Sequence, residues 1–159
     1  MKNLKTLLSS ENMDWGTPQA FFDDLDKEFG FTLDPCATNK TAKCKTYFTK
    51  KTNGLIQDWS QNTVFCNPPY GGEIKHWVKK CYDESQKPDT TVVMLIPART
   101  DTTYWHEYIF PNAEVRFIKG RLKFEGLQKG SGSAPFPSAL VIFRPPIPKS
   151  IETIRGENA

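Results

Sequence analysis

Two spacings of apolar residues alternate along the chain, one typical of helices and one typical of buried strands. Large apolar residues recur at the three- and four-residue spacing of an amphipathic helix at Phe21, Phe22, Leu25 and Phe29. Thr17 and Pro18 precede them as a helix N-cap and a first helical residue, and Gly30 is typical of a helix end. The pattern therefore predicts a helix that Thr17-Pro18 opens and Gly30 closes.

Short apolar and β-branched runs predict strands at residues 31–33, 46–48, 63–66, 90–96, 113–118 and 138–143. The run at 90–96 is apolar throughout, which is typical of a strand covered on both faces. Residues 73–84 and 102–109 predict further helices. Because strands and helices alternate, we expect an α/β fold with a mostly parallel sheet and helices on both faces.

The length and hydrophobic content of the chain indicate one domain. The chain has 159 residues, of which 38% are hydrophobic, and this supports one compact domain with a real core. We expect a flexible N-terminal segment at 1–12, a single domain at 13–146 and a C-terminal tail at 147–159. The net charge of +3 is compatible with binding to a polyanion. No apolar stretch approaches a membrane span or a signal core, so we expect a cytoplasmic protein without membrane contact.

The cysteines give no sign of a metal site. Cys36, Cys44, Cys66 and Cys81 form no Cys-x-x-Cys pair, and the chain has two histidines. In a reducing cytoplasm such thiols are small buried apolar groups. We therefore expect no metal.

The most informative residues are Asn67, Pro68, Pro69 and Tyr70, which follow the predicted strand at 63–66. The Asn67 side-chain oxygen and the Pro68 carbonyl can each accept one N–H of a substrate amino group, which localises the nitrogen lone pair. Two prolines stiffen the turn, and Tyr70 can lay its ring against a base. These features suit methyl transfer onto an exocyclic amine. Asn-Pro and Pro-Pro are also ordinary loop residues after a strand.

Two further loops carry polar residues beside predicted strands, at residues 34–37 (DPCA) and at Asp58-Trp59. Ligands of α/β sheets bind beyond the carboxyl ends of the strands, so we expect these loops to converge with residues 67–70.

Ordered motifs across residues 13–145 resemble the phage-encoded DNA N6-adenine methyltransferase family. The matching segments are WGTP (15–18), LDPCA (33–37), GL with DW (54–59), NPPYG (67–71), Trp77, LIPARTDT (95–102), GRLKF (120–124) and APFPSA (134–139). The resemblance implies a Rossmann-like S-adenosylmethionine-dependent methyltransferase fold. It further implies S-adenosylmethionine as the methyl donor, and an adenine flipped out of DNA as the acceptor.

The resemblance also implies residue roles. Residues 67–70 are the catalytic group, and the cofactor-binding residues are Thr17, Pro18, Asp34, Cys36, Asp58, Trp59 and Asn67. Two of these have structural alternatives, because Thr17-Pro18 is also explained as a helix cap and Asp34 as a turn former. Asp58 resembles the acidic residue that receives the adenine amino group of the cofactor.

This sequence departs from related methyltransferases at three points. The loop after Asp34 lacks the glycines that allow close approach of the cofactor. No acidic residue follows the strand at 46–48, so the ligand of the ribose hydroxyls stays unassigned. There is also no room for a separate target-recognition domain.

DNA contacts must therefore come from loops, and we expect Arg99, Arg121 and Lys123 to contribute them. The stretch at 130–133 (GSGS) has the composition of a mobile loop beside these residues. Two other functions remain open from sequence: an amino-methyltransferase acting on RNA or on a protein glutamine, and a non-catalytic DNA-binding relative. The oligomeric state is not predicted.

Overall fold

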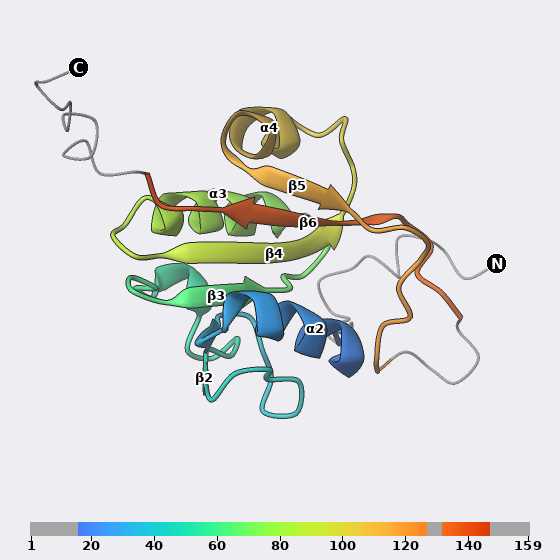
Figure 1. The fold of residues 1–159 in the computed structure, drawn as a ribbon, viewed down its shortest axis with the longest axis horizontal. Helices are drawn as coiled ribbons and strands as arrows, with labels where there is room; N and C mark the ends of the chain where they lie inside the picture. The colour runs from blue at the N-terminus through green and yellow to red at the C-terminus, as the bar shows by residue number, and fades with distance from the viewer. Residues whose placement is uncertain (1–15, 127–131, 147–159) are drawn as a thin grey trace, which may run out of the picture.

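The computed structural model describes residues 16–126 and 132–146. The predicted N-terminal segment, the C-terminal tail and residues 130–131 of the GSGS stretch lie outside these residues. Six strands form one central sheet in the order β2-β1-β3-β4-β6-β5 (Figure 1). The strands are β1 (Leu33–Asp34), β2 (Thr46–Tyr47), β3 (Thr63–Cys66), β4 (Thr91–Pro97), β5 (Glu114–Phe117) and β6 (Ser138–Phe143). Every predicted strand is therefore present, although β1 and β2 are short.

The three predicted helices are present as α2 (Gln19–Phe29), α3 (Ile74–Ser85) and the π-helical turn η2 (Trp105–Ile109). The 3-10 turn η1 (Gly54–Ile56) and the short α4 (Phe110–Asn112) were not predicted. Gly30 ends α2 with a φ of 67°, a left-handed conformation that favours glycine. No helix in the described part of the chain is long and apolar enough to cross a membrane.

The sheet is mixed, so the expectation of a mostly parallel sheet is wrong. Strands β2, β1, β3 and β4 pair in parallel, whereas β6 runs antiparallel to both of its neighbours, β4 and β5. The chain leaves β5 and returns as β6 between β5 and β4, which reverses the direction of β6. An apolar run carries no information about strand direction, and this explains the error.

Helices cover both faces of the sheet (Figure 1). On one face, Phe22 of α2 packs edge-to-face against Phe65 of β3, with the ring centroids 5.1 Å apart. On the other face, Tyr82 of α3 packs against Phe143 of β6 at 5.9 Å. Successive side chains of a strand point to opposite faces, so Phe65 packs on one face of the sheet and its buried neighbour Cys66 packs on the other.

The parallel strands bring their carboxyl ends to one edge of the sheet. Residues 34–37 leave β1 there, residues 67–70 leave β3, and Arg99 follows β4. Asp58 and Trp59 precede β3 and so stand near its amino end. This arrangement separates the candidate residues into two groups.

Candidate active site

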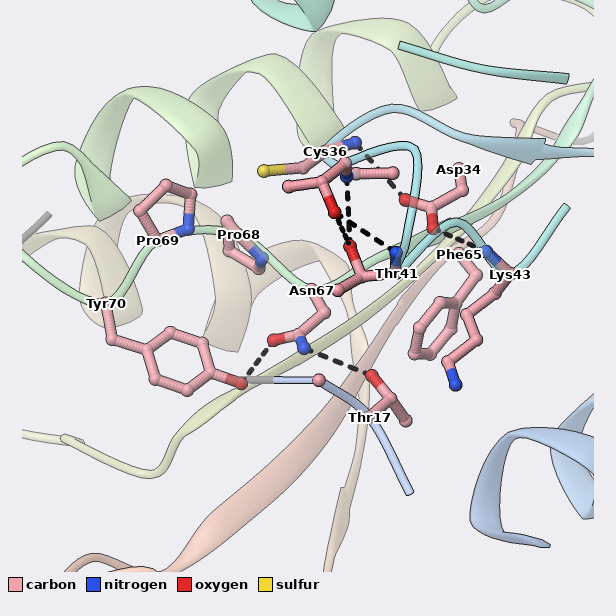
Figure 2. Close-up of a pocket in the computed structure, with 13 residues that line it drawn as sticks. Thr17, Asp34, Cys36, Thr41, Lys43, Phe65, Asn67, Pro68, Pro69 and Tyr70 are labelled. Atoms are coloured by element: carbon pink, nitrogen blue, oxygen red, sulfur yellow. Dashed lines mark hydrogen bonds between the residues drawn. The ribbon is translucent and has the colours of Figure 1, made fainter. Parts of the chain in front are cut away.

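The loop at residues 67–70 lines a pocket at the carboxyl edge of the sheet (Figure 2). Sequence-predicted site residues that line the same pocket are Thr17, Asp34, Cys36, Asn67, Pro68, Pro69 and Tyr70. Two strand ends and the segment before α2 supply these groups. The expected convergence of the loops after β1 and β3 is therefore confirmed.

The Asn67 carboxamide is held at both ends. Its oxygen accepts a hydrogen bond from the Tyr70 hydroxyl at 2.5 Å, and its nitrogen donates to the Thr17 hydroxyl at 3.1 Å. The Tyr70 hydroxyl also lies 3.0 Å from the Leu95 carbonyl oxygen, which ties it to β4. The amide plane is thus fixed by residues from three separate parts of the chain.

The Tyr70 ring lies inside an aromatic cluster. Its side chain is 5% exposed, and its ring meets Phe124 and Phe136 edge-to-face with centroids 6.1 and 5.6 Å apart. Burial raises the pKa of the Tyr70 hydroxyl well above its usual range, so the hydroxyl stays neutral and can donate. Stacking of a base on this ring requires the covering phenylalanines to part from it.

Thr17 does not cap the helix, and that prediction is wrong. Helix α2 begins at Gln19 with Pro18 as its N-cap residue, and no side chain of that residue caps it. The Gln19 N–H instead donates to the Glu125 carboxylate at 2.9 Å. Because a distant carboxylate caps the helix, the buried Thr17 hydroxyl is directed to Asn67.

Asp34 folds the loop that follows β1. Its two carboxylate oxygens accept the backbone N–H groups of Cys36 at 3.2 Å and Lys43 at 3.1 Å. Burial raises the pKa of Asp34 from 3.8 to about 6, although the two N–H groups act in the opposite direction. Asp34 therefore shapes this loop and also presents a buried carboxyl group to the pocket.

A second pocket adjoins the first. Its lining consists of Pro35, Cys36, Ala37, Thr49, Lys50, Asn53, Gly54, Leu55, Pro69, Glu73 and Trp77. Cys36, Ala37 and Pro69 line both pockets, so the two pockets are neighbours along the loop after β1. A Cβ on Gly54 would lie 2.1 Å from the Pro35 carbonyl oxygen, so the two backbones approach closely here. Gly54 therefore allows η1 to pack directly against the loop after β1.

Asp58 and Trp59 lie outside both pockets. The Asp58 carboxylate accepts from Lys87 at 2.9 Å and from Ser60, and Lys87 holds the pKa of Asp58 well below its usual range. Trp59 is fully buried, and its indole N–H donates to the Gly54 carbonyl oxygen at 3.0 Å. Both residues precede β3 and anchor η1 to the end of α3. The expected convergence of their loop with residues 67–70 in one pocket is therefore not found.

A third cleft meets the first pocket at Tyr70. It is lined by Tyr70, Gly71, Gly72, Ile74, Lys75, His76, Lys79, Arg99, Asp101, Thr102, Thr103, Tyr104, Glu107 and Tyr108. Arg99 therefore stands beside the loop at residues 67–70. Arg121 and Lys123 are exposed on the segment after β5 that also carries Phe124. Tyr70 separates the pocket from this open cleft.

Sequence reasoning missed several lining residues. Lys43 lines the first pocket with a side chain that is 9% exposed, and its Nζ donates to Gln19 at 2.8 Å. Nothing in its lysine-rich surroundings marks it. Trp77 and Gly54 stand in the matched motifs, yet their place in the second pocket depends on how α3 and η1 pack.

The described residues contain no cluster of His, Cys, Asp or Glu side chains suited to hold a metal ion. All four cysteines are free thiols. Cys36 is half-buried, and removal of its thiol from water raises the pKa of this group, so the thiol is neutral in the pocket.

An amide oxygen held in place at the end of a parallel strand, beside a pocket with a buried carboxyl group, is suited to accept a hydrogen of an amino group. The family model for DNA N-6-adenine-methyltransferase (Dam) matches residues 5–157, and the chain belongs to this family. The DNA N-6-adenine-methyltransferase of Haemophilus phage HP1 (strain HP1c1) is 30% identical over 140 residues, covering 84% of this chain and 80% of that protein. The family resemblance and the enzyme class predicted from the sequence are confirmed.

Proposed function

We propose that this enzyme transfers a methyl group from S-adenosylmethionine to N6 of an adenine flipped out of DNA. Family membership supports the reaction and the acceptor. The observation that carries the proposal is the Asn67 carboxamide, whose plane is fixed by Thr17 and Tyr70 at the mouth of the pocket. We further propose that the sheet is a shortened Rossmann-like methyltransferase sheet. The host bacterial cytoplasm is the expected place of action, since the relative is a phage protein.

The two neighbouring pockets are proposed to take the two ends of the donor. The buried Asp34 carboxyl group suits the cationic methionine end. The second pocket suits the nucleoside end, because Trp77 supplies an apolar wall and Glu73 is the single carboxylate among its described lining residues. Glu73 is therefore our candidate for the ribose hydroxyls. The backbone approach at Gly54 gives this pocket its shape.

S-adenosylmethionine, when bound, supplies an electrophilic methyl group on a sulfonium. The protein must make the acceptor nitrogen nucleophilic, because the lone pair of an adenine amino group is delocalised into the ring. The Asn67 side-chain oxygen and the Pro68 carbonyl are proposed to accept the two amino hydrogens and so localise that lone pair. Pro68 and Pro69 keep the carbonyl fixed, since each proline locks its φ angle.

The acceptor base is proposed to enter from the cleft beyond Tyr70. Arg99 lines that cleft, and Arg121 and Lys123 are exposed on the neighbouring segment, where they can contact phosphates. Unstacking of the base costs a few kcal/mol, which contacts in the cleft must offset. Stacking on the Tyr70 ring would follow displacement of Phe124 and Phe136.

Methyl transfer from radiolabelled S-adenosylmethionine tests the proposal. Offered separately with DNA, RNA and protein, the enzyme should label DNA, and sequencing should place the methyl group on adenine. Asn67→Ala should abolish labelling while the dissociation constant of the cofactor changes little. Asn112→Ala is a matched control, because the Asn112 amide lies in α4 and donates to Tyr108. Labelling of RNA or protein in place of DNA would establish the other acceptor class, and full activity in Asn67→Ala would reject the proposed role.

A further inference from the structure

Thr17 reaches the catalytic loop from a distant part of the chain. Its hydroxyl accepts a hydrogen bond from the Asn67 side-chain nitrogen at 3.1 Å, across 50 residues of sequence. Figure 2 shows the Thr17 and Tyr70 hydroxyls at opposite ends of the Asn67 carboxamide. The two contacts have different consequences for the reaction.

Tyr70 contacts the same amide oxygen that the acceptor amine is expected to use. The amine must therefore share that oxygen with Tyr70 or displace its hydroxyl. Thr17 contacts the amide nitrogen and does not compete with the amine. When the acceptor is in place, the Thr17 contact still opposes rotation of the amide plane, and a rotated amide would present N–H groups to an amine.

The segment that carries Thr17 is itself held firmly. Gly16 and Glu125 form an antiparallel bridge with N–H to carbonyl distances of 2.9 and 2.8 Å. On the other side of Thr17, the Gln19 N–H donates to the Glu125 carboxylate. The Thr17 side chain is 2% exposed, so water does not compete strongly for its hydroxyl. A hydroxyl that is held rigidly and shielded from water is well suited to position a neighbouring group.

We infer that Thr17 is a positioning residue, whose hydroxyl orients the Asn67 carboxamide so that its oxygen faces the acceptor amine. This role differs from the cofactor contact expected from the sequence, since Thr17 acts through Asn67. It rests on the proposed function of Asn67 as an acceptor of the amino hydrogens.

Three substitutions separate the hydroxyl from the shape of the side chain. Thr17→Val keeps the shape and removes the hydroxyl, Thr17→Ala removes both, and Thr17→Ser keeps the hydroxyl. We expect kcat on DNA to fall about tenfold in the valine and alanine variants, the loss of one hydrogen bond that acts in the transition state. The serine variant should retain kcat within about twofold of the original enzyme. Thr91→Val makes the same change at the first residue of β4, at the end of the strand opposite the candidate site, and is the control.

A readout independent of activity is the side-chain amide signal of Asn67 in a nitrogen-15 correlation spectrum, assigned by its loss in Asn67→Ala. The signal should shift in the valine and alanine variants and return in the serine variant. The dissociation constant of S-adenosylmethionine should stay within about twofold throughout, because the amide and not the donor is affected.

Two outcomes would overturn the inference. An unchanged kcat and an unchanged Asn67 signal in both hydroxyl-free variants would show that Thr17 does not position the amide. A weaker cofactor affinity with an unchanged kcat would make Thr17 a cofactor ligand instead. The proposed function fails separately, when the original enzyme does not methylate DNA at all.

Discussion

The Tyr70 hydroxyl donates a hydrogen bond of 2.5 Å to the side-chain oxygen of Asn67. Two residues of the same loop thus form one unit, and Leu95 holds the hydroxyl from β4. The proposed acceptor oxygen is already oriented and partly occupied before any base arrives. An amide oxygen has two lone pairs, so it can in principle accept an amino hydrogen as well as the Tyr70 hydroxyl.

Tyr70→Phe tests this unit directly. The substitution keeps the ring among Phe124 and Phe136 but removes the hydroxyl bonded to Asn67. We expect kcat to fall roughly fivefold and the free energy of unfolding to fall by about 1 kcal/mol, since one buried hydrogen bond is lost. Steady-state kinetics on DNA and urea denaturation measure the two effects. An unchanged kcat would show that the hydroxyl does not orient the amide.

Tyr70→Ala is not a direct test of base stacking, because it affects both base binding and the stability of the fold. Loss of stacking would weaken base binding by roughly 1–3 kcal/mol. The ring is 5% exposed, however, so its removal also leaves a cavity that costs about 3–5 kcal/mol of stability. The phenylalanine variant avoids this second effect.

Gly54→Ala should damage the second pocket. The new methyl group would lie 2.1 Å from the Pro35 carbonyl oxygen, and backbone cannot yield as a side chain does. We expect the free energy of unfolding to fall by about 1–3 kcal/mol through overpacking. Cofactor affinity, measured by calorimetry, should fall because η1 and the loop after β1 both line the pocket. Gly72→Ala is the control for stability, since its methyl group meets nothing within 4 Å. Equal stability of the two variants would contradict the close approach.

Glu84→Ala should destabilise the fold strongly. The Glu84 side chain is 5% exposed, pairs with Lys80 at 2.5 Å and Lys87 at 2.9 Å, and accepts the Trp59 backbone N–H at 2.8 Å. Lys80 keeps the Gln57 carbonyl oxygen as an acceptor, and Lys87 keeps Asp58. The buried Trp59 N–H loses this acceptor, so we expect a loss of about 1–3 kcal/mol. Thermal or urea unfolding measures the loss.

The neighbouring residue provides a matched control for Glu84. The pair between Asp83 and Lys79 has side chains that are 49% and 57% exposed. Asp83→Ala should therefore cost less than about 1 kcal/mol. Similar losses in the two variants would show that burial does not set the strength of the Glu84 network.

The sequence predicted where the loops of the candidate site lie, but it did not predict the direction of β6 or the contact made by Thr17. Apolar runs placed β3 and β6 at their observed bounds, and the carboxyl edge of parallel strands explains why Asp34 and Asn67 meet. The direction of β6 was not predictable, because it depends on where the chain inserts a strand. Thr17 was assigned to a helix cap because local sequence cannot reveal the competing Glu125 carboxylate.

The place of Asp58 could be read from the sequence, because Asp58 precedes the predicted strand at 63–66 and so stands at its amino end. The structure pairs it with Lys87 near the amino end of the sheet. Lys43 and Trp77, by contrast, line the pockets through long-range packing that no local pattern contains.

Asp34 should make stability depend on pH. Burial raises its pKa from 3.8 to about 6, so between these pH values the folded protein keeps a proton that the unfolded chain releases. Stability from this residue is therefore fully present below about pH 4 and falls as the pH rises to 6, by roughly 3 kcal/mol in total. Glu28 and Glu114 have lowered pKa values and contribute in the opposite direction. The difference between the original protein and Asp34→Asn in urea denaturation isolates the Asp34 contribution.

The same carboxyl group should make cofactor binding depend on pH with the opposite sign. A cationic donor favours the ionised form of Asp34, so binding should expel the proton and affinity should rise as the pH increases from 5 to 7. Calorimetry with S-adenosylmethionine in buffers of different ionisation enthalpy measures both the affinity and the released proton. Asp34→Asn cannot ionise and should remove this rise, while any titration of the donor's own amino group persists. A rise of equal size in Asp34→Asn would exclude Asp34 as the group that the donor's charge meets.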